Sequence, residues 1–372
     1  MRFLIITHVE HQVTTEAVSA YAPYVREMNL WLKHVDEVTV VAPETNKKKS
    51  AIDLNYNHGN LNFKAIPAIQ FTDIKTIFLS IFKIPIILYS IFKACRKADH
   101  IHLRCPGNIG MFGCFVQILF PNKTKTAKYA GNWDPEAIQP LSYKLQKKLL
   151  SSTVLTKKMT ALVYGDWKDQ TKNIQSFFTA TFNNEERQIP KKRDYAGRLN
   201  FVFIGSLVTG KRPLFTIQIV EQLLKLNYDV TLDLYGDGIL KTELLDYITN
   251  NNLTARVRLL GNQEKNVIKE TLKNAHFLIL PSKSEGWPKA VAEAMFFGAI
   301  PISTAVSCVS TMLNFGARGV IIEPKLDSAI QTITKIMSNQ VPLKAMAHEA
   351  AKWSQKYTLD TFESEIIKLL KA

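Results

Sequence analysis

The stretch LPSKSEGWPKAVAEAMFFG, residues 280–298, carries the pattern that decides the fold. An apolar run ends at Leu280, a short polar loop follows, and a helix is expected from about Pro288. The apolar segment AIPIS comes directly after it and predicts a further strand. A strand, a loop, a helix and another strand in this order are typical of a parallel sheet with crossover helices.

The same alternation fills the chain in two halves. Between them lies the polar stretch 183–200, which contains Pro190 and many charges and is expected to be an interdomain linker. The sequence therefore predicts an α/β protein of two Rossmann-like domains, 1–190 and 195–354. The strands are expected near 2–7, 37–42, 61–69, 100–103, 127–130, 161–164, 201–205, 230–236, 257–261, 277–282, 299–303 and 319–323, and the first helix over 18–32.

The composition indicates which classes of binding partner and which cellular compartment to expect. The 372 residues carry a formal net charge of +15, which indicates an anionic partner such as nucleotide phosphate, an acidic membrane surface or nucleic acid. No clustered basic and aromatic motif supports nucleic acid, so none is expected as a partner. The first apolar run is too short for a signal peptide, and the four cysteines show no paired spacing. A reducing, cytoplasmic setting is expected.

The most apolar stretch is 74–95, IKTIFLSIFKIPIILYSIFKAC. Three lysines and Pro85 interrupt it, whereas a membrane-spanning helix needs about 20 nearly uninterrupted apolar residues. A packed helix with one very apolar side is the favoured interpretation. A helix that dips into a membrane surface and a spanning helix are the alternatives.

Two glutamates in the 280–298 stretch could bind a sugar nucleotide. Glu285 precedes the expected helix, and Glu293 lies about two turns inside it. Gly286 allows close backbone approach, and the helix start suits a phosphate. Glu293 stands among apolar residues and needs a partner, for which ribose hydroxyls would serve. Alternatively, Glu285 caps the helix and Glu293 pairs with a lysine.

Two further loops follow predicted strands of the second half. FIGSLVTGKRP, residues 203–213, brings Lys211 and Arg212 to the start of a helix, where cations can stabilise the charge of a departing diphosphate. A solvated turn is the simpler alternative. LDLYGDG, residues 232–238, is a strand that ends in a glycine-rich turn at Gly236.

The string EGWPKAVAE closely resembles the E-x7-E motif of the family 4 retaining glycosyltransferases. The resemblance implies the GT-B fold, in which two Rossmann-like domains face each other across a cleft. It also implies transfer from a nucleotide-diphosphate sugar with retention of configuration, and catalytic roles for Glu285 and Lys211. The donor-binding residues that it implies, partly by region, are Gly205, Ser206, Lys211, Arg212, Gly236, Gly286, Trp287, Pro288, Lys289 and Glu293.

The chain departs from the family pattern at two places. Ser206 stands where the family usually has an arginine, which Arg212 would have to replace. Gly131 and Asn132, in KYAGNWDP, stand where many members have a histidine. The closing segment 350–370 resembles the family's last helices, and 355–372 is expected to cross back to the first domain. On the acceptor or sugar side we expect His8, Arg104, Asn108, Gly131 and Asn132.

The expected activity is therefore transfer of a sugar to a hydroxyl of a glycan or lipid-linked acceptor, in cell-envelope polysaccharide or glycolipid synthesis. No D-x-D triplet occurs, which favours catalysis without a metal ion, and no cofactor is expected. A metal site at His8 and His11 is the weaker alternative. The lysines of 144–158 and the apolar helix suggest peripheral attachment to the cytoplasmic membrane, against which stands a simply soluble basic face. A sugar-nucleotide epimerase, a phosphorylase and a non-catalytic glycan-binding protein remain as alternative functions.

Overall fold

The computed structural model describes residues 1–47, 53–69 and 74–371. The chain divides into two compact units. Unit 1 comprises Met1–Phe178 and Phe362–Ala372, and unit 2 comprises Thr179–Thr361. The chain thus returns to unit 1 at its end.

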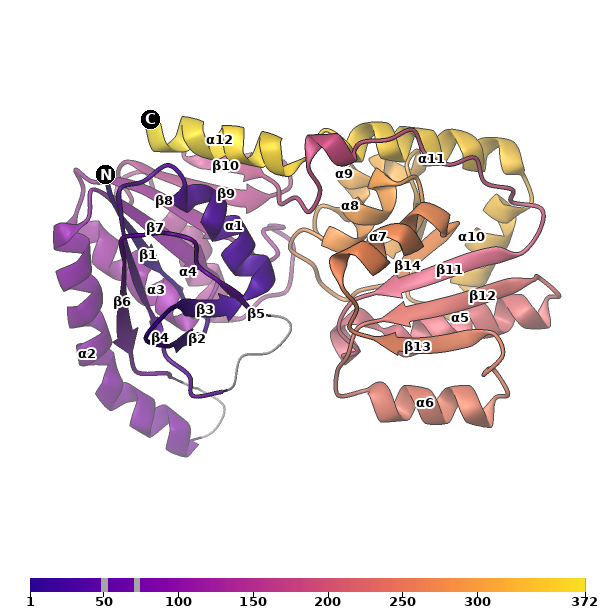
Figure 1. The fold of residues 1–372 in the computed structure, drawn as a ribbon, viewed down its shortest axis with the longest axis horizontal. Helices are drawn as coiled ribbons and strands as arrows, with labels where there is room; N and C mark the ends of the chain where they lie inside the picture. Colours follow the sequence, from indigo (N-terminus) through magenta and orange to yellow (C-terminus); the bar gives the residue numbers. More distant parts are fainter. Residues whose placement is uncertain (48–52, 70–73, 372) are drawn as a thin grey trace. The chain divides into compact units, whose positions relative to one another are not determined.

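Unit 1 is built on a parallel sheet of seven strands in the order β10-β9-β8-β7-β1-β4-β6 (Figure 1). The five strands between the two edge strands are mostly buried on both faces, as parallel strands are when helices cover them. They are β1 (Arg2–Ile6), β4 (Glu37–Pro43), β6 (Leu61–Ile66), β7 (His100–Cys105), β8 (Thr124–Tyr129), β9 (Met159–Tyr164) and β10 (Ile174–Phe177).

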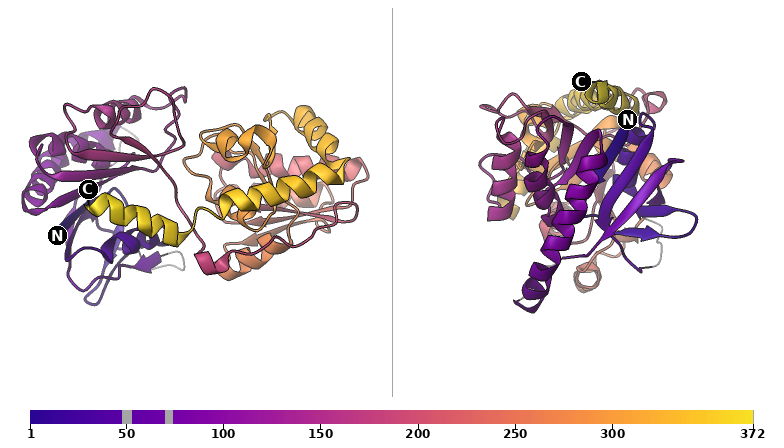
Figure 2. Two further views of the ribbon diagram at one scale, coloured as in Figure 1. Left: turned by 90° about the horizontal axis from the view of Figure 1, so that it is seen from above. Right: turned by 90° about the vertical axis from the view of Figure 1, so that its left-hand side faces the viewer.

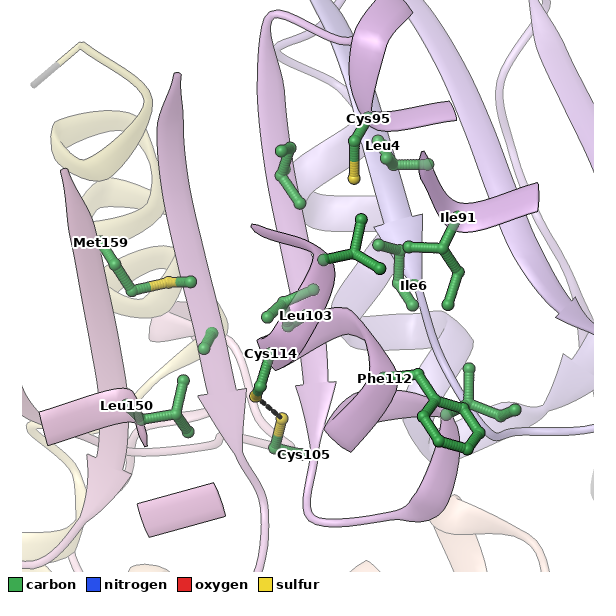
Figure 3. Close-up of a cluster of buried hydrophobic side chains, with 14 of the residues drawn as sticks. Leu4, Ile6, Ile91, Cys95, Leu103, Cys105, Phe112, Cys114, Leu150 and Met159 are labelled. Carbon is green, nitrogen blue, oxygen red and sulfur yellow. Dashed lines mark hydrogen bonds between the residues drawn. The ribbon is translucent and has the colours of Figure 1, made fainter. Parts of the chain in front are cut away.

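Helices cover both faces of this sheet (Figures 1 and 2). Three helices pack on one face, where they share a core with Leu4, Ile6 and Leu103, as Figure 3 shows. They are α2 (Ile74–Lys97), α3 (Asn108–Val116) and α4 (Leu141–Ser151). The other face meets α1 (Ala22–Leu32), whose Trp31 stacks on Phe3, and α12 (Leu359–Lys371).

A small antiparallel sheet corrects the helix expected over 18–32. Its strands are β2 (His11–Val13), β3 (Val18–Tyr21) and β5 (Asp53–Asn55). The 3-4 spacing of Val18, Tyr21 and Val25 fits a helix face, but the first part of that segment pairs with strands on both sides. The helix itself begins at Ala22, next to a proline in its first turn.

Unit 2 contains a second parallel sheet, of six strands in the order β13-β12-β11-β14-β15-β16. The strands are β11 (Leu199–Ile204), β12 (Val230–Tyr235), β13 (Val257–Gly261), β14 (Phe277–Leu280), β15 (Ile300–Thr304) and β16 (Val320–Ile322). The helices are α5 (Pro213–Lys225), α6 (Lys241–Asn250), α7 (Lys265–Asn274), α8 (Lys289–Phe296), α9 (Val309–Met312), α10 (Leu326–Met337) and α11 (Gln340–Ser354).

The stretch 183–200 is not a free linker, because it lies inside unit 2. Arg193, which is 9% exposed, donates to the carbonyl oxygens of Ala275 at 2.6 Å and Phe297 at 2.9 Å. Further bonds reach the carbonyls of Leu272 and Lys273, both at 3.2 Å. The charged composition predicted an interdomain linker, but this arginine is buried because carbonyl oxygens at the ends of α7 and α8 accept hydrogen bonds from its guanidinium.

The four cysteines are free and buried. Cys105, at the end of β7, and Cys114, in α3, lie in the core with their sulfur atoms 3.8 Å apart (Figure 3). The hydrogen bond to Cys105, together with burial, raises the pKa of the Cys114 thiol well above its usual range. These thiols therefore pack as small apolar side chains.

Candidate functional site

Lys211 and Glu285 meet at the carboxyl edge of the unit 2 sheet. The Lys211 Nζ atom lies 2.5 Å from Glu285 Oε1, and Ser282 Oγ donates to the same oxygen at 2.6 Å. Glu285 is only 8% exposed, so its carboxylate is held by a cation and a hydroxyl rather than by water. The two residues predicted to be catalytic are thus brought together, from loops that follow β11 and β14.

These two loops also bind each other through their backbones. The amide of Lys283 donates to the carbonyl of Gly210 at 2.8 Å. Arg212 adopts a left-handed conformation, with φ 52°, and its Nη1 donates to the carbonyls of Pro281 at 3.0 Å and Ser282 at 3.3 Å. The loop that carries both cations is therefore fixed against the loop that carries Glu285.

A glycine-rich turn supports the loop after β11 from the other side. Gly236 has φ +134°, and a Cβ atom added there would lie 2.0 Å from the carbonyl oxygen of Gly205. The amide of Gly205 donates to the carbonyl of Tyr235 at 3.0 Å, and the amide of Leu207 donates to that of Asp237 at 2.9 Å. Only a glycine allows the turn after β12 to come this close to the loop after β11.

Glu293 lies in a second cluster of unit 2, in the second turn of α8. Its Oε1 accepts a hydrogen bond of 2.6 Å from Thr181 Oγ1. Trp287 and Lys289 line the same small cavity, together with Tyr357. The partner that the apolar surroundings of Glu293 required is therefore a threonine rather than a lysine.

The remaining predicted residues of unit 2 have different surroundings. Ser206 is exposed, and Pro288 occupies the position directly before α8. The carbonyl of Gly286 accepts bonds from Ser307 Oγ at 3.1 Å and Cys308 Sγ at 3.4 Å, which fixes the backbone directly after Glu285.

Two polar residues of these clusters, Ser282 and Thr181, were not predicted from the sequence. Ser282 stands three residues before Glu285, so its place in the same loop was a usable signal. Thr181 is distant in sequence from Glu293, and no local pattern indicates their contact.

Unit 1 has a cavity of its own at the carboxyl edge of its sheet. His8 and Asn108, two of the residues predicted on the acceptor side, line it. Ala68, Ile69, Ile109 and Tyr143 give it an apolar part, and Glu10 a carboxylate. Burial, and to a smaller extent the charge of Arg104, lowers the pKa of His8, so this histidine faces the cavity as a neutral imidazole.

The other predicted residues of unit 1 do not line this cavity. Arg104 is held by Glu27, with 3.4 Å between Nη1 and Oε2, and lies over the ring of Tyr24. Gly131 packs against Pro106, where an added Cβ atom would lie 2.9 Å from Cγ. Asn132 accepts a bond from the amide of Asp134 at 2.9 Å and stabilises its own turn.

Both ring nitrogens of His11 are hydrogen-bonded within unit 1. Its ring nitrogens lie 2.7 Å from the carbonyl of Val9 and 2.8 Å from the hydroxyl of Tyr56. Burial lowers the pKa of His11 to about 4. Because His11 lies on a strand, the helical spacing that suggested a site with His8 does not apply. Within residues 1–47, 53–69 and 74–371, no group of three His, Cys, Asp or Glu side chains is arranged to hold a metal ion.

Comparison with known proteins follows the same division of the chain. Residues 184–353 match the family model described as "Glycosyl transferases group 1". An uncharacterized glycosyltransferase from Methanocaldococcus jannaschii is 24% identical over 164 residues, which are 44% of this chain and 45% of that protein. An Escherichia coli protein named UDP-Gal:alpha-D-GlcNAc-diphosphoundecaprenol alpha-1,3-galactosyltransferase is 31% identical over 150 residues, 39% of this chain and 38% of that one. The matches span less than half the length of these relatives.

Similarity to solved structures extends over the whole chain. Sucrose-phosphate synthase from Thermosynechococcus elongatus superimposes with a TM-score of 0.70 at 12% sequence identity, over 100% of this chain and 98% of that one. At this identity the likeness concerns the fold alone. The predicted fold class, α/β with two Rossmann-like units of the GT-B type, is confirmed.

Proposed function

We propose that this chain is a retaining, metal-independent glycosyltransferase that uses a nucleotide-diphosphate sugar. The match of residues 184–353 to the family model of the glycosyl transferases group 1 supports this proposal. The observation that carries this proposal is the cluster of Lys211, Ser282 and Glu285 on loops fixed at the carboxyl edge of the unit 2 sheet. Parallel α/β sheets bind their ligands at this edge.

The chemistry needs cations where the leaving group gathers charge. In the proposed reaction the oxygen of an acceptor hydroxyl bonds to the anomeric carbon. The bond from that carbon to the diphosphate oxygen breaks, and its electron pair stays on the diphosphate. The ammonium of Lys211, with Arg212, stabilises this charge. The hydroxyl proton passes to the leaving phosphate, and attack from the same face retains the configuration.

The two glutamates have separate parts in the proposal. Glu285 and the backbone after it bind the sugar, and Glu293 binds the ribose hydroxyls. Before the donor binds, Lys211 neutralises the buried Glu285. A diphosphate that attracts Lys211 would release Glu285 oxygens to accept bonds from sugar hydroxyls. Lys211 is thus suited to exchange the carboxylate of Glu285 for the diphosphate of the donor.

For the acceptor we propose a hydroxyl of a glycan or of a lipid-linked sugar, used in cell-envelope polysaccharide or glycolipid synthesis. The name of the E. coli relative, which describes a galactosyltransferase acting on a diphosphoundecaprenol-linked sugar, supports this class. The proposed location is the cytoplasm, at the inner face of the cell membrane.

Thermal unfolding in the presence of UDP, GDP, ADP and their sugars, with and without magnesium, tests the donor site. A nucleotide at 100 times its dissociation constant should stabilise the fold by about 2.7 kcal/mol. We expect one base to raise the melting temperature without metal, and the rise to vanish in Lys211→Ala and Glu293→Ala. Lys335→Ala, at an exposed helix position of the same unit, is the matched control and should keep the rise.

Absence of any shift with every nucleotide would contradict the proposal. A shift that needs magnesium would contradict metal independence. An epimerase of the same fold is separated by product analysis, since it would convert the sugar nucleotide alone into its epimer without an acceptor.

A further inference from the structure

The outer face of α2 is an exposed apolar ridge. Its six side chains are 51–65% exposed: Phe78, Leu79, Ile81, Phe82, Ile86 and Tyr89. The rings of Phe78 and Phe82 touch each other, with centroids 4.9 Å apart. The start of α2 also extends past the strands that the helix covers (Figures 1 and 2).

The inner face of the same helix belongs to the core of unit 1. Ile87 and Ile91 are fully buried there. The segment Phe78–Lys97 is long and apolar enough to cross a membrane by length and composition, but only 28% of its apolar window is buried inside the fold. A helix with one side in a protein core and the other side apolar and exposed can lie in a membrane surface without leaving the fold.

The layer of α2, α3 and α4 carries only basic charges. Their sequences contain five basic residues in α2 and three in α4, and no aspartate or glutamate. Lys93, Arg96 and Lys97 are exposed at the end of α2, and Lys144 and Lys148 are exposed on α4. An apolar ridge on a layer of helices that carries basic and no acidic side chains is complementary to a surface of acidic head groups over an acyl interior.

The ridge also has a defined place relative to the cavity of unit 1. Each of the three helices follows a strand of the parallel sheet, so all three begin at its carboxyl edge. The cavity lies at that edge and is lined by Ile69 before α2, Asn108 in α3 and Tyr143 in α4. The ridge occupies the first two thirds of α2 and therefore lies toward the cavity end of the layer.

We propose that the layer of α2, α3 and α4 docks on an anionic lipid bilayer, with the ridge inserted at the boundary between head groups and acyl chains. The basic residues at the far end of α2 contact acidic head groups. In this orientation the cavity lies at the membrane surface. If the chain has the proposed function, docking therefore selects a lipid-linked acceptor over a soluble glycan.

Flotation with vesicles tests the docking surface. Wild-type protein should float with phosphatidylglycerol–phosphatidylcholine vesicles at low salt, and far less with phosphatidylcholine alone. Replacement of Phe78 and Phe82 by glutamate should lower the partition coefficient about tenfold or more for each ring. Lys93→Gln and Lys97→Gln should lower it about fivefold each. Val341→Glu, at a 75% exposed apolar position of unit 2, is the matched control and should float like the wild type.

A fluorescent label tests the orientation. The four native cysteines are buried, so a single introduced cysteine can be labelled selectively. An environment-sensitive dye at Phe82→Cys should brighten and shift to the blue on vesicle binding, and the same dye at Val341→Cys should not change. A dye at Lys97→Cys should change less than the dye at Phe82→Cys. The reverse order would overturn the proposed orientation.

Three outcomes would overturn the docking proposal: no flotation of the wild type, unchanged flotation of the Phe78 and Phe82 variant, or a dimer of the wild type that this variant abolishes. The last would identify a second copy of the chain as the occupant of the ridge. Neither assay requires a donor. A nucleotide-induced thermal shift without vesicle binding would therefore refute the docking surface alone, and vesicle binding without a shift would refute the donor site alone.

Discussion

Replacement of Gly236 by alanine should distort the loop that carries Lys211 and Arg212 without removing any polar side chain. The residue has φ +134°, a conformation that costs a side-chain-bearing residue about 1–3 kcal/mol. The added Cβ would lie 2.0 Å from the carbonyl oxygen of Gly205, so one of the two loops must move. Relief of such overpacking costs about 1–3 kcal/mol more. We expect a loss of about 3 kcal/mol in the free energy of unfolding of unit 2.

Differential scanning calorimetry can measure this loss. For a unit of this size, about 3 kcal/mol corresponds to a fall of roughly 6–12 °C in melting temperature. Two other glycines of unit 2 provide graded controls. Gly261 has φ +69° but open space around its Cβ position, so Gly261→Ala should cost only about 1 kcal/mol. Gly210 has open space as well and no positive φ, so Gly210→Ala should change little.

Gly236→Ala should also weaken nucleotide binding at temperatures where the variant is still folded. Because Gly205 and Leu207 both bond to the turn that contains Gly236, displacement of that turn shifts the loop that carries Lys211. Gly236→Ala should therefore lose the nucleotide-induced stabilisation even below its own melting temperature, whereas Gly261→Ala keeps it. If Gly236→Ala has the same melting temperature as Gly210→Ala and binds nucleotide normally, the turn after β12 does not support the loop after β11.

Three further perturbations test the ion pair of Lys211 with Glu285, the burial of His100 and the hydrogen bonds of Arg193. In urea unfolding, Lys211→Met and Glu285→Gln should each lower the free energy of unfolding of unit 2 by about 1–3 kcal/mol. The double variant should lose less than the sum of the two, and a loss equal to the sum would contradict the ion pair. Burial lowers the pKa of His100 to about 4, so the unfolded chain binds a proton that the folded chain does not, and stability should fall as pH drops from about 6.5 to 4. Chemical unfolding across this range should show a shallower fall for His100→Asn, and an unchanged slope would contradict the burial of a neutral ring. Arg193→Met should cost about 3 kcal/mol or more because buried carbonyls lose their donor, whereas exposed Lys192→Met should cost almost nothing in the same measurement.

The strands and the loops that carry Lys211 and Glu285 were predictable because they depend on local pattern. Apolar runs that end in glycine or a polar loop located β11, β12 and β14. The same runs placed Lys211 and Glu285 after strands of one parallel sheet, where carboxyl ends share an edge. Whether these residues also bind a nucleotide sugar remains a prediction.

The features that could not be predicted depend on contacts between residues that are distant in the sequence. The strand Val18–Tyr21 is stabilised by pairing with Asp53–Asn55, and its own spacing suits a helix equally well. The burial of Arg193 depends on carbonyls about 80–100 positions further on, which makes a charged stretch part of a core. Similarly, the bond from Thr181 to Glu293 joins two segments that no periodicity relates.

The return of the chain to unit 1 through α12 has a consequence for synthesis. Phe362 packs on Phe177 and Phe178, and Glu363 bonds to Lys33 and His34 of the same unit. A ribosome that makes roughly 5–20 residues per second needs about 10 to 40 s to add the whole of unit 2 before these contacts can form. During that interval the first 178 residues must keep an aromatic surface uncovered, while unit 2 can fold as soon as it emerges. The unit made first is therefore the one completed last.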